Sequence, residues 1–267
     1  MIIWYWMRRK TSFSCRAKKL RFFASGGSDL ERMVCFTDQL TLTEKWECIF
    51  LIPMEEAAIS GNGVCIFAKY LMDNEYVTEK KFAIETLSGT IEVECLNARA
   101  TEFRVNMGKA SFLSREIPVT GEVREVIDEP FTFNKKEYKA TCLTVGNPHC
   151  IIFMDQVSQE KVRELGPYVE NADEFPERVN LQICRQIDKG NLDIEIWERG
   201  SGYTKASGTG SCAAAIAAYR KGLMENRINV NQPGGMIQID IKEDGTIFMT
   251  GTVGYIAEMS VAESFFS

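Results

Sequence analysis

Ser60-Gly61-Asn62-Gly63-Val64-Cys65 and Ser207-Gly208-Thr209-Gly210-Ser211-Cys212 share one pattern, S-G-x-G-x-C, and each precedes an apolar stretch that predicts a helix. Glycine lets the backbone turn tightly and approach a ligand closely. The first N–H groups of a helix have no intrahelical acceptor, and this end of the helix carries partial positive charge. Two such ends facing one cavity would hold a small anion such as an α-carboxylate. The repeat therefore predicts two similar half-molecules that share one site.

The two serines have a simpler interpretation as well. Serine is a preferred residue at the N-cap of a helix, so Ser60 or Ser207 taken alone would be read as an ordinary cap. The repetition, with the same glycine and cysteine positions in both copies, favours a functional role for the pair.

Composition limits the classes of function. The 267 residues, with 45% hydrophobic residues, 25% charged residues and a net charge of −6, are typical of a soluble globular protein and give no basic surface for nucleic acid. Nine cysteines without C-x-x-C spacing, and a single histidine, argue against a disulfide framework and a metal site. No apolar run approaches the roughly 20 residues that cross a bilayer. We expect a cytoplasmic protein without a cofactor or metal. The basic, acid-free first 28 residues leave import into a plastid or another organelle as a weaker alternative.

Short strands with alternating polarity predict a sheet-rich N-terminal lobe. A hairpin is expected over residues 82–95 around a Ser88-Gly89 turn, with further strands at 103–107, 131–138 and 140–145. Residues 146–149 form a turn, and 150–154 read as a buried strand. Residues 159–165 have helical spacing, which Gly166 and Pro167 are expected to end.

The second lobe is predicted to repeat the order of helix and hairpin. A strand over 192–197 leads to the serine motif and an alanine-rich helix over 213–218, which has almost no polar face and should be enclosed on all sides. A hairpin then bends at Asp244-Gly245. The sequence thus predicts an α/β (α+β) chain with an N-terminal lobe, residues 1–145, of which 1–54 are divergent, and a C-terminal lobe, residues 146–267.

Few other side chains suit chemistry near neutral pH. His149 is the only histidine, and it follows a Gly-Asn-Pro turn that exposes side chains. Asn147 and Asn180 could hydrogen-bond a polar substrate or only hold their turns. Glu198-Arg199 at a strand end could be a surface ion pair, although Arg199 could also clamp a distal carboxylate.

Taken together, the motifs resemble those of the diaminopimelate epimerase family, which comprises amino-acid racemases and epimerases that work without pyridoxal phosphate. The resemblance runs from about residue 55 to the C-terminus, and it lies in Ser60–Gly63, Gly146–His149, Phe175–Asn180, Trp197–Gly200, Ser207–Gly210 with the following alanines, and Pro233–Gly235. It implies two pseudo-symmetric lobes, each a curled sheet or small barrel around a central helix, with the site in the cleft between them. It further implies epimerisation of LL- and meso-diaminopimelate, a precursor of lysine and peptidoglycan, and a homodimer.

The resemblance also implies a role for each site residue. In the family, one cysteine from each lobe flanks the substrate Cα, and one removes a proton while the other supplies one; Ser60 and Ser207 occupy these positions here. The resemblance puts Glu198 and His149 beside this acid–base pair. It assigns contacts with the α-carboxylate to Gly61, Asn62, Gly208 and Thr209, and contacts with the distal end to Asn147, Asn180 and Arg199.

Serine in place of cysteine predicts impaired catalysis. A thiol ionises near pKa 8.5, whereas a hydroxyl is a much weaker acid and needs a neighbouring base. The neighbouring Cys65 and Cys212 should point away from the helix mouths and not substitute. Three interpretations stay open: a slow epimerase, a non-catalytic amino-acid-binding homologue, and a lyase of the hydroxyproline dehydratase type that needs one proton abstraction. The family's N-terminal Gly-Asn-Asp-Phe type of motif has no counterpart in residues 1–54.

Overall fold

The computed structural model describes residues 20–25, 33–37, 60–86 and 89–259. Its helices are α2 (Gly61–Asp73), α3 (Gln159–Glu170) and α4 (Gly208–Arg220). The strands are β1 (Leu20–Ser25), β2 (Met33–Thr37), β3 (Lys81–Thr86), β4 (Gly89–Cys95), β5 (Glu102–Lys109), β6 (Glu129–Phe133), β7 (Lys136–Thr144), β8 (Pro148–Phe153), β9 (Asn180–Gln186), β10 (Asn191–Glu198), β11 (Gly202–Thr204), β12 (Arg227–Gln232), β13 (Gly235–Ile241) and β14 (Thr246–Met259).

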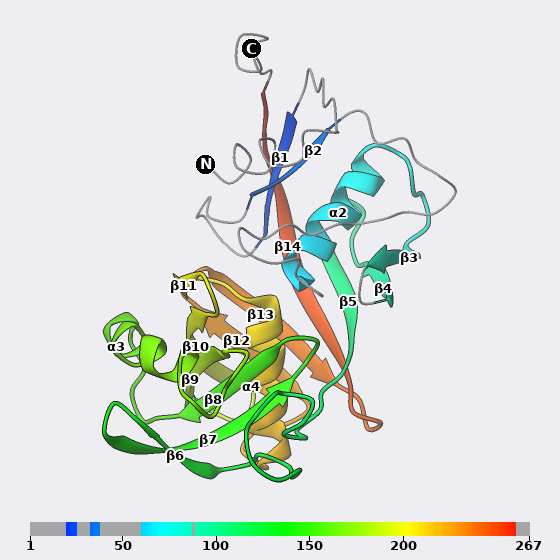
Figure 1. Cartoon of the computed structure of the whole chain (residues 1–267). Coiled ribbons are helices and arrows are strands. Elements are labelled where there is room, and N and C mark those ends of the chain that lie inside the picture. The colour runs from blue at the N-terminus through cyan, green and yellow to red at the C-terminus, as the bar shows by residue number, and fades with distance from the viewer. Residues whose placement is uncertain (1–19, 26–32, 38–59, 87–88, 260–267) are drawn as a thin grey trace.

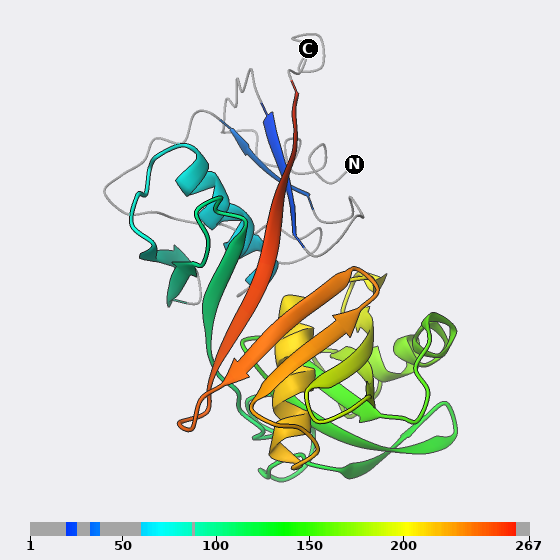
Figure 2. The same cartoon turned by 180° about the vertical axis from the view of Figure 1, so that it is seen from behind.

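Within the described residues the chain forms a mixed α+β fold built on one long, strongly bent sheet. The strand order is β3-β4-β5-β14-β13-β12-β10-β9-β8-β7-β6, with β1 and β2 added beside β14 and β11 beside β10. Figures 1 and 2 show two halves, one around α2 and one around α4, with β14 running from one half into the other. The expected α+β class is confirmed.

Each half contains one enclosed helix. In α2 every residue from Gly61 to Leu71 is buried, and the helix packs on β1, β5 and β14. In α4 every residue from Gly208 to Ala218 is buried, against strands β7–β10 and β12–β14. The small alanine side chains let these strands approach α4 closely, as the absence of a polar face predicted. One apolar cluster includes both helices, so the core is continuous between the halves.

Both predicted hairpins are present. β3 pairs with β4 in antiparallel register, from Lys81 opposite Glu94 to Thr86 opposite Gly89. β13 pairs with β14, and the bend between them includes Gly245 with φ of 85°. Glycine adopts this left-handed conformation without the steric cost that a Cβ would bring. The alternating apolar residues of both hairpins face the continuous core.

Helix α3 differs from the prediction that it ends at Gly166 and Pro167. It continues through both residues to Glu170. Packing explains the extension, because Val162, Leu165 and Val169 are buried in a second apolar cluster between α3 and the sheet. A Cβ on Gly166 would lie 2.3 Å from the Trp197 ring, so glycine is needed for the helix to lie this close to β10.

The predicted lobe boundary at 145/146 falls within an antiparallel pair of strands. β7 and β8 pair from Ala140 opposite Ile152 to Thr144 opposite Pro148. Strands β6 and β7 therefore share one sheet with β8 and β9 in the half around α4. The other half is completed by β14, which pairs with β5 and β1.

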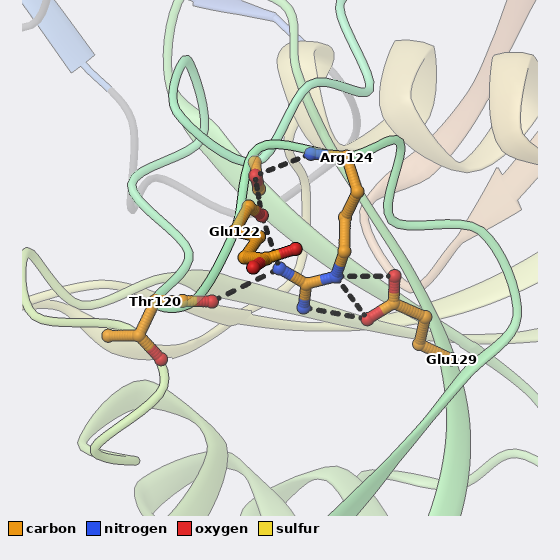
Figure 3. Close-up of polar contacts among 5 residues, drawn as sticks. Thr120, Glu122, Arg124 and Glu129 are labelled. Atoms are coloured by element: carbon orange, nitrogen blue, oxygen red, sulfur yellow. Dashed lines mark hydrogen bonds and ion pairs between the residues drawn. The ribbon is translucent and has the colours of Figure 1, made fainter.

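The loop between β5 and β6 is held by one arginine. The Arg124 guanidinium contacts Glu129 through Nε at 2.8 Å and Nη2 at 2.8 Å, and its Nη1 donates to the carbonyls of Thr120 and Glu122 (Figure 3). These bonds to Glu129 raise the pKa of Arg124. These bonds hold the loop beside β6. Its residues Ile117, Val119 and Val126 are buried in the second apolar cluster.

Candidate active site

Both serines of the repeated motif are N-caps with the same geometry. Ser60 Oγ accepts from Gly63 N at 3.3 Å, and Ser207 Oγ accepts from Gly210 N at 3.2 Å. Both residues have extended backbones, as N-caps do. The capping interpretation is therefore correct for both, and a catalytic role of either oxygen stays a prediction. Ser207 is buried, whereas Ser60 is half-buried.

The first turns of α2 and α4 meet each other. A Cβ added to Gly208 would lie 3.4 Å from both the backbone N and the Oδ1 of Asn62, and 3.0 Å from Sδ of Met249. A Cβ on Gly61 would lie 2.8 Å from the same sulfur. Met249 on β14 thus packs against both glycine turns, and neither turn has room for a side chain. The convergence predicted from the repeat is present, with both positive helix ends directed at one region.

This region contains buried amide groups without partners. Asn62 is 3% exposed and its Nδ2 has no hydrogen-bond acceptor, although buried amides are usually paired. Gln182, fully buried, and Gln232, 7% exposed, have unpartnered Nε2 atoms. Oε1 of Gln232 accepts from the backbone N of Ser207 at 2.9 Å, which places this amide at the cap of α4. Unpaired N–H donors beside two helix N-termini are suited to an anion.

A chain of hydrogen bonds connects His149 to the first turn of α4. His149 Nε2 lies 2.9 Å from Oδ1 of Asn147, and Nδ2 of Asn147 donates to Oγ1 of Thr209 at 3.3 Å. On its other side, His149 Nδ1 lies 2.9 Å from Oε1 of Gln182. The turn before β8 is thereby tied to α4, and three of the predicted site residues are brought together.

The His149 ring is held neutral. The residue is fully buried, and burial lowers the pKa of its imidazole from 6.5 to about 4. The hydrogen bond to Gln182 raises this pKa, whereas the nearby positive charge of Arg199 lowers it further. A neutral ring has one N–H and one lone pair, so it can both donate and accept a hydrogen bond.

Asn180 cross-links the two loops around the site. Its Nδ2 donates to the carbonyl of Pro148 at 2.7 Å, and its Oδ1 accepts from the backbone N of Arg199 at 2.9 Å. The Arg199 guanidinium donates to the carbonyl of Glu177 at 2.8 Å. Glu198 ends β10 opposite Gly202, next to Arg199, and is half-buried. Asn180 therefore acts first as a structural link.

Sequence reasoning missed four residues that shape the site: Gln182, Gln232, Met249 and Glu170. Glu170, at the end of α3, accepts from Trp197 Nε1 at 2.7 Å and from Gly200 N at 2.8 Å. No short motif marks any of them, since each acts on residues distant in sequence. The one available signal was a polar residue between two apolar neighbours, as Gln182 is between Leu181 and Ile183.

The thiols nearest the serines are inert. Cys65 and Cys212 are fully buried in the core, and burial raises the pKa of each thiol to about 12. Neither thiol can therefore serve as a base near neutral pH. Among the described residues, no group of three or more His, Cys, Asp or Glu side chains could hold a metal ion. Over the same residues, no helix is long and apolar enough to span a membrane.

Comparison with known proteins adds sequence and structural relatives. The model of the diaminopimelate epimerase family matches residues 141–256. Diaminopimelate epimerase 2 of Nostoc sp. is 44% identical over 212 residues, which cover 79% of this chain and 74% of the relative. Diaminopimelate epimerase of Methanothermobacter thermautotrophicus is 38% identical over 200 residues, which cover 74% of this chain and 70% of the relative.

Solved structures share the fold at low sequence identity. A phenazine biosynthesis protein of the PhzF family from Enterococcus faecalis aligns with a TM-score of 0.63 at 11% identity, over 91% of this chain and 98% of that one. A probable proline racemase from Agrobacterium radiobacter aligns with a TM-score of 0.61 at 14% identity, over 81% and 72% of the two chains. These similarities concern the fold alone.

Proposed function

We propose that this chain, which belongs to the diaminopimelate epimerase family, binds diaminopimelate and interconverts its LL and meso forms. The reaction removes the proton from one Cα and returns a proton to the opposite face. In this proposal one of Ser60 and Ser207 removes the proton from Cα, and the other delivers a proton to its opposite face. The rate is expected to be low, because each serine hydroxyl is a far weaker acid than the thiol that the family resemblance implies.

One observation carries the proposal: two serine-capped helices direct their first turns at the same region, where Asn62 has a buried amide without an acceptor. An α-carboxylate would supply the missing acceptor and would be stabilised by both helix ends. First-turn N–H groups of Gly61, Asn62, Gly208 and Thr209 are the proposed donors. The serine oxygens would then lie beside the bound Cα.

The distal end of the substrate is assigned to the loops beside α4. Asn147 is bonded to Thr209, so a group that binds Asn147 lies next to the carboxylate donors. Arg199 supplies a guanidinium, whose fork matches a carboxylate. Asn180 holds the backbone of Arg199 and the Pro148 carbonyl in place, which supports a positioning role in addition to any contact with substrate.

General acid–base help would have to come from His149 and Glu198. The neutral ring of His149 can accept a proton, although its pKa of about 4 makes it a weak base at neutral pH. General acid–base groups contribute about two to four decades of rate. Loss of both thiols is therefore expected to slow exchange by at least about a hundredfold relative to a variant that has them.

Hydrogen exchange at Cα tests this function directly. The chain is incubated with LL-diaminopimelate in deuterated water, and loss of the Cα proton signal is followed by NMR. We expect slow exchange with the natural chain, fast exchange with the S60C/S207C variant, and none with S60A/S207A. Absence of exchange in both the natural chain and S60C/S207C would contradict the proposed reaction.

A second candidate is a non-catalytic amino-acid-binding protein. It is favoured by the bonding of both serine oxygens, each of which already accepts a capping bond. Thermal stabilisation by diaminopimelate, together with exchange only in S60C/S207C, would support this candidate. A one-base lyase instead predicts loss of water across Cα and Cβ of 3-hydroxyproline, supplied in place of diaminopimelate, and NMR would detect the conversion to a pyrroline carboxylate.

We also propose a cellular location for the protein and an oligomeric state. Six buried cysteines are free, which fits a reducing compartment such as the cytoplasm: Cys65, Cys95, Cys142, Cys150, Cys184 and Cys212. The basic N-terminal segment on which organelle import depends lies largely outside the described residues. The homodimer implied by the family stays a prediction, which sedimentation of the purified chain would test.

A further inference from the structure

Gln182 lies between the only histidine and the cap of α4. It is fully buried in β9, and its Oε1 lies 2.9 Å from Nδ1 of His149. Its Nε2 lies 2.9 Å from the point that a Cβ on Gly210 would occupy, and Oγ of Ser207 lies 3.1 Å from the same point. A side chain at Gly210 would therefore collide with the Gln182 amide and with Ser207, which border the same small space.

The amide groups around His149 constrain where its proton can be. As oriented, the ring lies between two amide oxygens, Oε1 of Gln182 and Oδ1 of Asn147. A neutral imidazole can donate to only one of them, so one amide must present its N–H to the other ring nitrogen. Asn147 can do this without losing a bond, because the Thr209 hydroxyl can donate to Oδ1 as readily as it accepts from Nδ2.

The other amide, that of Gln182, presents its oxygen to the ring. Gln182 has no exposed surface, and its Oε1 faces the ring while its Nε2 faces the first turn of α4. With Oε1 of Gln182 as the acceptor, the ring proton belongs on Nδ1, since the bond made by one ring nitrogen determines the state of the other.

We propose that Gln182 is a positioning residue for the proposed reaction, which keeps the proton of the His149 ring on Nδ1 and leaves the Nε2 lone pair facing Asn147 and Thr209. His149 Nε2 then accepts a hydrogen bond from the Asn147 amide, which ties the ring to Thr209 on α4. The unpartnered Nε2 of Gln182, beside Ser207, is available as a donor to the serine oxygen or to a bound anion. The catalytic consequence rests on the function proposed above, whereas the state of the ring does not.

The single histidine makes the ring state directly measurable. The natural chain is labelled with ¹⁵N-histidine, purified without a histidine tag, and studied by long-range ¹H–¹⁵N NMR at neutral pH. We expect a protonated Nδ1 and an unprotonated Nε2. In the Gln182→Met variant, the only remaining acceptor is Oδ1 of Asn147, so the proton should move to Nε2. Gln182→Glu keeps an acceptor oxygen and should keep the proton on Nδ1.

Gln232→Met is the matched control, because Gln232 is also a buried amide at the cap of α4 with an unpartnered Nε2, but it makes no recorded contact with His149. Its spectrum should retain the Nδ1–H state. A natural chain with Nε2–H overturns the proposal, even if Gln182→Met fails to fold. So does a folded Gln182→Met that keeps Nδ1–H, or a Gln232→Met that loses it. Since the spectrum needs no turnover, failure of Cα exchange in every variant contradicts the proposed function alone.

Discussion

The buried imidazole of His149 makes the stability of the protein depend on pH. Its pKa falls from 6.5 to about 4 on folding, so the unfolded chain binds a proton between these values that the folded chain does not. The contribution to stability is fully present above pH 6.5 and is lost as the pH falls to about 4. The shift corresponds to about 3 kcal/mol.

Urea unfolding of the natural chain and of His149→Gln across this range measures the contribution. The free energy of unfolding of the natural chain should fall more steeply toward acid than that of the variant. Parallel curves for the two proteins would show that His149 titrates alike in both states, contrary to the burial of its ring.

The serine caps should contribute to stability independently of catalysis. Ser60→Ala and Ser207→Ala each remove an acceptor from a first-turn N–H, which typically costs about 1 kcal/mol. Ser158→Ala is the matched control, since Ser158 caps α3 by accepting from Lys161 N at 3.3 Å. We expect all three variants to lose stability in chemical denaturation, but only the first two to weaken diaminopimelate binding. Weakened binding in Ser158→Ala would show that the effect is not local to the site.

At the scale of elements, α3 fixes the loop that follows β10 through one carboxylate. Glu170 accepts from Trp197 Nε1 and Gly200 N, and it also pairs with Arg178 at 3.3 Å. Glu170→Ala removes the acceptor of all three donors, which costs about 1–3 kcal/mol for each donor that water does not reach. Urea unfolding should show a loss of that order. Glu164→Ala, at an exposed position of the same helix, should change stability little.

The elements that local pattern could predict were those with regular alternation or a clear turn. Both hairpins around residues 82–95 and 237–249 were predicted from alternating apolar residues. The end of α3 was predicted wrongly, because Gly166 and Pro167 normally end a helix. Here glycine instead makes room for Trp197, a residue 31 positions later. A contact of that kind leaves no trace in the local sequence.

The same limit applies to the whole molecule. The repeated serine motif predicted that two helix ends would meet, and they do. The lobe boundary at residues 145 and 146 stays a prediction, and the pairing of β7 with β8 across it depends on which surfaces pack together. Gln182 and Met249 lie far in sequence from the serines that they adjoin, so only the folded chain brings them to the site.

Met249 joins the two halves where the serine-capped turns meet, and its removal should uncouple them. It is fully buried on β14, with its sulfur against both Gly61 and Gly208. Met249→Ala should cost about 2–5 kcal/mol through lost burial and the cavity left behind. Met236→Ala, at a position 54% exposed on the neighbouring strand, is the control and should cost far less.

A double-mutant cycle with Gly61→Ala tests whether the contact is direct. In the natural background the new Cβ would lie 2.8 Å from the Met249 sulfur, so the methionine must shift and stability should fall. In the Met249→Ala background that obstacle is gone, and the new methyl group partly fills the cavity. The two changes should therefore be non-additive by about 1 kcal/mol in urea unfolding, with the double variant more stable than the sum predicts. Additive effects would mean that the first turn of α2 does not rest on Met249, and that the two halves are held at the site by other contacts.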